Sequence, residues 1–194
     1  MNLPTKITVS RLVLIPVFIA LFLIPFPYHQ LIATAVFVVA SLTDWLDGHI
    51  ARKCNMVTTL GKFLDPVADK VLVASALILA TTLEVGIGDK IAIVVCSVVI
   101  IARELIITCF RTIAATKNVI LAADKIGKAK TATQLTGLTF YLSFAEVGEL
   151  NATVGQVFFY IGFVCLMIAT VLTLVSALNY IIRNRAVLKE DSEQ

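Results

Sequence analysis

Six long apolar segments, separated by short polar stretches, dominate the 194-residue sequence. A helix needs roughly 20 residues to cross the ~30 Å hydrocarbon core of a bilayer, and several of these segments approach that length. Backbone groups in lipid must be hydrogen-bonded within the segment, which favours helices. We therefore predict an all-α integral membrane protein with six transmembrane helices, at about residues 8–24, 31–48, 60–83, 91–115, 131–145 and 154–182.

The composition supports this class. Hydrophobic residues make up 59% of the chain, whereas a soluble domain is usually nearer half apolar. The first apolar run follows basic residues, as in a signal peptide, but no small-residue cleavage site precedes the next segment. We expect a retained first helix, one six-helix membrane domain over residues 1–185, and a polar cytoplasmic tail over residues 186–194.

Lysine and arginine residues fall almost entirely on one side of this topology. Lys90 falls on the opposite side, and Lys70 and Arg103 fall within segments. The others share the side of the N-terminus: Lys6, Arg11, Arg52, Lys53, Lys62, Arg111, Lys117, Lys125, Lys128, Lys130, Arg183, Arg185 and Lys189. Basic residues concentrate in cytoplasmic loops, so both termini are predicted to be cytoplasmic.

Four aspartates stand close together where the second segment ends and the third begins. Asp44 and Asp47 are three residues apart, and Asp65 and Asp69 are four apart. Both spacings place side chains on one face of a helix. A short connection joins the two segments, so we expect the two pairs to face each other at the cytoplasmic interface.

A cluster of four carboxylates needs positive charge nearby. Like charges repel strongly where water is scarce, and acids at membrane depth usually mark function. Hard oxygen ligands suit Mg²⁺, Mn²⁺ or Ca²⁺, and two such ions would favour displacement at phosphorus. The alternative is that these acids are solvated at the interface or paired with Arg52, Lys62 and Lys70.

The aspartates belong to a longer pattern, D-x2-D-G-x2-A-R-x8-G-x3-D-x3-D, which runs from Asp44 to Asp69. It resembles the signature of the CDP-alcohol phosphotransferases, with every interval kept. The fixed positions are Asp44, Asp47, Gly48, Ala51, Arg52, Gly61, Asp65 and Asp69. Together with the six apolar segments, the resemblance covers nearly the whole chain and implies the fold of that family.

Secondary motifs resemble one branch of the family, the phosphatidylglycerophosphate synthases. They are NLPTKIT at residues 2–8, ARE at 102–104 and IGKAKT at 126–131. The resemblance implies a phosphatidyltransferase that uses CDP-diacylglycerol and sn-glycerol 3-phosphate and releases CMP. The topology places the active site of this multi-pass protein at the cytoplasmic side, and the lack of a transit peptide favours a bacterial cell membrane. The resemblance also implies a homodimer.

The resemblance further assigns roles to the residues of the signature. All four aspartates would hold two Mg²⁺ or Mn²⁺ ions, and Asp69 would also be the general base. Gly48, Arg52 and Thr58 would contact CDP-diacylglycerol. A glycine lets a ligand approach the backbone closely, and a guanidinium suits phosphate.

The acceptor, a phosphate monoester, needs an anion site of its own. The candidates are Arg103, which lies inside a segment, and Arg111, Lys128 and Lys130. Helix N-termini favour anions, so the start of the fifth segment could contribute. Membrane topology alone would also explain these basic residues, apart from Arg103. For Arg103 the alternative involves its neighbour Glu104, in an ion pair with Lys70 or another buried partner.

Other functions remain open at this stage. A sister enzyme could use inositol phosphate, serine or phosphatidylglycerol as the acceptor. Membrane prenyltransferases also pair aspartates with magnesium, although not with the spacing of Gly48, Arg52 and Gly61. A divalent-ion transporter would need acids near the bilayer midplane, whereas these lie toward one interface.

Overall fold

The computed structural model describes residues 3–54, 59–116 and 125–183, and it describes side chains for residues 10–43, 67–112, 114 and 127–182. Within these residues all regular structure is helical. The helices are α1 (Leu3–Leu23), α2 (His29–Cys54), α3 (Thr59–Ala80), α4 (Ile87–Thr116), α5 (Lys125–Leu150) and α6 (Ala152–Arg183). The predicted all-α fold with six helices is confirmed for this part of the chain, while the expected tail at residues 186–194 lies outside it.

The helices extend beyond the apolar segments that predicted them, and the difference is greatest for α5. The expected range was 131–145, but the helix spans Lys125–Leu150, 26 residues. Lysines in its first turns and glutamates in its last turns lower the hydropathy without interrupting the helix. At about 1.5 Å per residue, α5 is therefore about 39 Å long.

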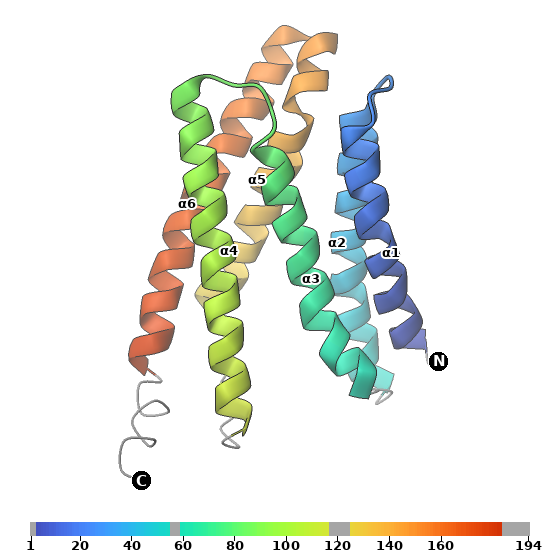
Figure 1. Ribbon diagram of the computed structural model, residues 1–194, viewed down its shortest axis with the longest axis vertical. Coiled ribbons are helices and arrows are strands. Elements are labelled where there is room, and N and C mark those ends of the chain that lie inside the picture. The colour runs from blue at the N-terminus through green and yellow to red at the C-terminus, as the bar shows by residue number, and fades with distance from the viewer. Residues whose placement is uncertain (1–2, 55–58, 117–124, 184–194) are drawn as a thin grey trace.

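Successive helices run in opposite directions (Figure 1). Helices α1, α3 and α5 begin, and α2, α4 and α6 end, toward the lower end of the molecule in this view. We call this the basic end, because Arg111, Lys128 and Lys130 lie on these helix ends. The opposite end, called the loop end, holds the connections at residues 24–28, 81–86 and 151.

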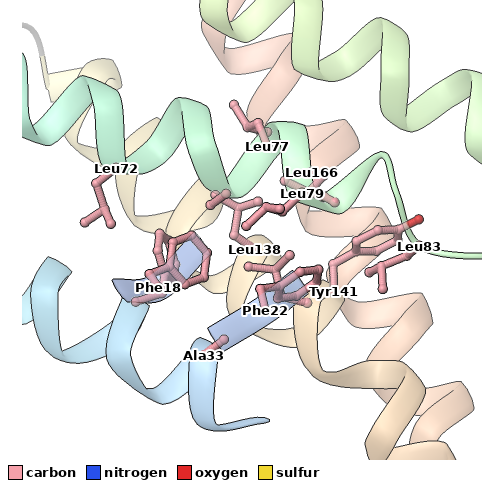
Figure 2. Close-up of a cluster of buried hydrophobic side chains, with 14 of the residues drawn as sticks. Phe18, Phe22, Ala33, Leu72, Leu77, Leu79, Leu83, Leu138, Tyr141 and Leu166 are labelled. Atoms are coloured by element: carbon pink, nitrogen blue, oxygen red, sulfur yellow. The ribbon is translucent and has the colours of Figure 1, made fainter. Parts of the chain in front are cut away.

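The core lies mainly between α1, α2, α3 and α5, and α4 and α6 each add buried side chains to it. Phe18 of α1, Leu72 of α3, and Leu138 and Tyr141 of α5 are at most 1% exposed. Figure 2 shows these side chains converging with Leu166 from α6. Burial of this many large side chains supplies the main favourable free energy of packing within the bundle.

Helices α5 and α6 form the most closely packed pair. At Gly162 of α6, an added Cβ atom would lie 2.6 Å from the backbone nitrogen of Tyr141. Only a residue without a side chain fits this approach, as in many membrane helix pairs. The hairpin is therefore a rigid support for the residues that α5 carries toward the basic end.

The outward faces of α4 and α6 are apolar and exposed. Val98 and Leu105 on α4 are 62% and 56% exposed, and Tyr160 and Leu178 on α6 are 64% and 63% exposed. Ile87–Thr112 and Ala152–Ile182 are each long and apolar enough to cross a membrane. Exposed apolar area of this extent is unusual for a soluble monomer and suits contact with lipid.

Candidate active site

The two aspartate pairs lie on α2 and α3 near the basic end. Asp44 and Asp47 belong to the last three turns of α2, and Asp65 and Asp69 to the first three turns of α3. The predicted helical placement of both pairs is therefore confirmed, and Figure 1 shows the end of α2 and the start of α3 close together at the basic end. Of these four aspartates, only Asp69 has a side chain that the structure describes.

Several other predicted site residues fall outside what the structure describes. The side chains of Asp44, Asp47, Gly48, Arg52 and Asp65 lie in helical turns whose side chains are not described. Thr58 lies outside the described residues altogether. The roles expected of these residues remain predictions.

Asp69 lines a cavity between α3, α4 and α5. The cavity has a volume of about 60 Å³, against a minimum of roughly 10–15 Å³ for one water molecule. Its polar lining consists of Asp69, Lys70, Glu104, Lys130, Thr131 and Gln134. Its apolar lining includes Leu77, Ile101 and Leu135. A polar ligand and an apolar chain could therefore both find complementary surfaces here.

A buried ion cluster forms the polar wall on the side of α4 and α5. Glu104 Oε1 accepts a hydrogen bond from Lys130 Nζ and another, at 3.1 Å, from Arg103 Nη1. The Lys130 side chain is only 4% exposed, compared with 26% for Glu104 and 13% for Arg103. Burying an ammonium group is costly unless it is paired, so Glu104 compensates for the burial of Lys130. The cluster carries one net positive charge beside Asp69.

Arg103 points from this cluster toward α6. Its Nη2 atom donates a 2.7 Å hydrogen bond to Ser176 Oγ, and it is not among the residues that line the cavity. Its Nε atom is buried and has no hydrogen-bond partner among the described residues. Arg103 thus joins α4 to α6 and reaches the cavity only through Glu104.

The other two predicted anion ligands lie apart from the cavity. Arg111 is exposed, its Nε atom donates a 3.2 Å hydrogen bond to the Tyr180 hydroxyl, and its guanidinium lies 5.4 Å from the centre of that ring. Lys128 is exposed on α5 and does not line the cavity. Of the four predicted acceptor ligands, the structure brings Lys130 alone to the cavity of Asp69.

Four polar residues of the cavity were not predicted as site residues: Lys70, Glu104, Thr131 and Gln134. Glu104 was considered only as a partner in an ion pair, and Gln134 was missed. The spacing contained a signal, because residues 130 and 134 are four apart on one helix and so share a face. Gln134 is buried, with 3% exposure.

The donor chemistry of the site fits a hard divalent cation. Asp69 offers only oxygen ligands and is exposed beside a polar cavity, which suits Mg²⁺ or Mn²⁺. Among the described residues, no group of three or more His, Cys, Asp or Glu side chains forms. The side chains of the other three aspartates of the signature are not among the described residues.

An all-α bundle with apolar outer faces, and with acidic and basic side chains beside a cavity near one end, fits the class of helical membrane proteins. The family model described as CDP-alcohol phosphatidyltransferase matches residues 1–175. The chain therefore belongs to the CDP-alcohol phosphatidyltransferase family.

Proteins of two different names are similar to this chain. A Bacillus subtilis protein named CDP-diacylglycerol–glycerol-3-phosphate 3-phosphatidyltransferase is 37% identical over 97% of each chain. A Shigella flexneri protein of the same name is 38% identical over 95% of this chain and 96% of its own. A rice protein named cardiolipin synthase (CMP-forming) is 40% identical, but over 74% of this chain and 46% of its own.

Proposed function

We propose that this chain transfers the phosphatidyl group of CDP-diacylglycerol to sn-glycerol 3-phosphate, giving phosphatidylglycerol phosphate and CMP. The names of the relatives that match nearly the whole chain support this reaction. The observation that carries it is the cavity shared by Asp69 and the buried Lys130. A base and a cation on one small cavity suit an acceptor that has a hydroxyl to activate and a phosphate to hold.

The reaction needs one proton transfer and one exchange of bonds at phosphorus. Asp69 takes the proton from the free primary hydroxyl of the acceptor, in the role of general base. The hydroxyl oxygen bonds to the phosphorus that bears diacylglycerol, the phosphoanhydride bond breaks, and CMP leaves. Lys130 holds the acceptor phosphate, Glu104 holds Lys130, and Arg103 in turn holds Glu104. Orientation of this kind supplies much of the catalysis in phosphoryl transfer.

The remaining proposed residues bind the donor substrate. Asp44, Asp47, Asp65 and Asp69 would hold two Mg²⁺ or Mn²⁺ ions, which when bound screen the charge of the diphosphate. Gly48, Arg52 and Thr58 would contact the nucleotide side of CDP-diacylglycerol. Lys128 and Arg111 take no part in the proposed anion site, because neither lines the cavity.

The proposed setting is a bacterial cell membrane. All six helices would cross the bilayer, with the basic end and both chain termini in the cytoplasm. The alternating helix directions and the basic residues at one end support this orientation. One catalytic domain would then span residues 1–185, and we propose a homodimer as the working state.

A panel of acceptors tests the reaction. Purified protein in detergent would receive CDP-diacylglycerol, Mg²⁺ and one acceptor at a time, and CMP release would be measured. We expect sn-glycerol 3-phosphate to raise CMP release well above water alone. Equal release with and without it would refute the proposal. Phosphatidylglycerol belongs in the panel because of the rice relative, and a preference for it would indicate the second candidate function.

Asp69→Asn tests the role of the base. The asparagine keeps the shape but cannot accept the proton, so we expect kcat to fall by about 10²- to 10⁴-fold. Binding of CDP-diacylglycerol should change less. Asp89→Asn, in the first turn of α4 at the loop end, is the matched control and should retain activity. A kcat within threefold of the unchanged protein would remove Asp69 from the role of general base.

A further inference from the structure

The side-chain amide of Gln134 is a buried polar group directed at the cavity. Gln134 is 3% exposed, belongs to α5, and lines the cavity together with Asp69 and Lys130. An amide has two N–H donors and a carbonyl acceptor. Within the described part of the chain, no residue hydrogen-bonds to this amide. The amide donors and acceptor are therefore available to a ligand that enters the cavity.

The neighbouring Thr131 hydroxyl on α5 is already engaged, and Lys130 uses one of its three N–H donors within the protein. Lys130 Nζ donates to Glu104, and Thr131 Oγ1 donates a 3.0 Å hydrogen bond to the Gly127 carbonyl oxygen, one turn earlier in the same helix. Gln134 therefore offers hydrogen-bonding capacity that the fold leaves unused at this wall. Its position one helical turn beyond Lys130 places it deeper in the bundle than the proposed phosphate site.

We infer that Gln134 recognises the 2-hydroxyl group of the acceptor and so determines specificity for a glycerol phosphate. This inference rests on the proposed function. sn-Glycerol 3-phosphate has three polar groups: the reacting hydroxyl goes to Asp69, the phosphate to Lys130, and the 2-hydroxyl remains. A hydroxyl donates and accepts one hydrogen bond each, which the two ends of an amide can match.

The experiment compares two acceptors that differ only in this hydroxyl. sn-Glycerol 3-phosphate and 3-hydroxypropyl phosphate would be assayed by CMP release with the unchanged protein and with Gln134→Met. Methionine has a similar length but cannot bond the hydroxyl. A site that hydrogen-bonds a hydroxyl rejects analogues without it. We expect the unchanged protein to prefer sn-glycerol 3-phosphate by at least about 10-fold in kcat/KM, and Gln134→Met to reduce this preference to about threefold or less.

Two further variants keep the test decisive. Thr139 lies on the same helix but does not line the cavity, and its hydroxyl donates a hydrogen bond to the Leu135 carbonyl oxygen. Thr139→Val should therefore leave the preference for sn-glycerol 3-phosphate unchanged. Gln134→Asn retains the amide but draws it back by one methylene group. It should also lower the preference, and it provides the measurement if Gln134→Met does not fold.

The outcomes separate the two proposals. Suppose that the unchanged protein uses sn-glycerol 3-phosphate. If the Gln134 variants then lower kcat/KM equally for both acceptors, or for neither acceptor, the role of Gln134 is refuted and the proposed function stands. The role of Gln134 is likewise refuted if the unchanged protein uses both acceptors with equal kcat/KM. If the unchanged protein releases no CMP with sn-glycerol 3-phosphate, both proposals fall.

Discussion

Two glutamates lie within the bundle, one toward each end, and they are stabilised in different ways. Glu146 on α5 lies at the loop end, where its side chain is 8% exposed. Glu104 on α4 lies toward the basic end, where its side chain is 26% exposed. Both are acids in a largely apolar chain, so each must recover the free energy that burial of a charge costs.

Glu146 is held by backbone groups of another helix. Its Oε1 accepts from the Gln30 amide at 3.0 Å and its Oε2 from the Leu31 amide at 2.9 Å. These amides belong to the first turn of α2, which has no acidic residue of its own. The first amides of a helix lack partners within it and carry partial positive charge, so a carboxylate is a suitable cap. His29 adds a contact at 3.6 Å.

Glu104 is held by side chains of α4 and α5 instead of backbone amides. A single oxygen, Oε1, accepts from both Lys130 and Arg103, and Glu104 lines the cavity. Among the described residues, its second oxygen has no hydrogen-bond partner. A carboxylate saturated by fixed amides supports the fold, whereas one shared between cations beside a cavity can position them for a ligand. This difference predicts that substitution of Glu146 lowers stability, whereas substitution of Glu104 lowers catalysis.

Glu146→Ala should have the largest effect, and the effect should be on stability. Both backbone amides at the start of α2 would lose their acceptor in a partly buried place, at about 1–3 kcal/mol for each unsatisfied group. We expect the free energy of unfolding to fall by about 3 kcal/mol. Thermal unfolding in detergent measures it. Below the transition, KM for both substrates should stay unchanged.

Glu149→Ala is the matched control for this change. Glu149 is exposed one turn further along the same helix, so its removal should alter stability by no more than about 0.5 kcal/mol. Equal losses in the two variants, or a raised KM in Glu146→Ala, would contradict a purely structural role for Glu146.

Glu104→Gln should have the next largest effect, and the effect should be on catalysis. Glutamine keeps the shape but not the charge that fixes Lys130, and a small misplacement of a positioning group can cost about 10²-fold in rate. We expect kcat/KM for sn-glycerol 3-phosphate to fall by about 30-fold, which corresponds to about 2 kcal/mol. The free energy of unfolding should fall by less than about 1 kcal/mol, because Glu104 is partly exposed.

Glu84→Gln is the control here, since Glu84 is an exposed glutamate in the connection at the loop end. If Glu104→Gln instead lost as much stability as Glu146→Ala and kept its kcat/KM, the two glutamates would have the same structural role. The contrast between the two ends of the bundle would then be wrong.

The helices were predictable because hydropathy measures what lipid requires, but their ends and partners were not. A window of apolar residues misses helical turns that carry lysine or glutamate, and these turns form both ends of α5. Gly155 and Gly162 are seven apart and share a face of α6, which the sequence shows. Which helix that face contacts depends on the packing of the whole bundle. The cap of α2 by Glu146 joins residues about 115 positions apart.

The site was predictable where its residues are close in sequence. The aspartate spacing correctly placed both pairs on helices, and their proposed roles remain to be tested. Lys128 and Lys130 looked equivalent by topology, but residues two apart on a helix face different directions. One is exposed and the other is buried against Glu104. The contribution of Arg103 was harder to foresee, because its Ser176 partner lies 73 positions away.

Gly155→Ala should have the smallest of these effects, and it tests how rigid the loop end is. An added Cβ would lie 2.3 Å from the Gly148 Cα and 3.1 Å from the Phe144 carbonyl oxygen, both backbone atoms that move only if α5 and α6 separate. Overpacking of this kind usually costs about 1–3 kcal/mol. Alanine recovers part of this through its higher helix propensity, so we expect a net loss of about 1.5 kcal/mol in the free energy of unfolding.

Gly148→Ala provides the contrast from the other side of the same contact. Its Cβ would meet the Gly155 Cα at 3.8 Å, an ordinary van der Waals distance. Because alanine favours the helix, this variant should be neutral or slightly more stable than the unchanged protein. Thermal unfolding of both variants in detergent should therefore give changes that differ in size or sign. Equal changes would show that the hairpin relaxes easily, and the loop end would then not be the rigid support that its glycine contacts and the Glu146 cap indicate.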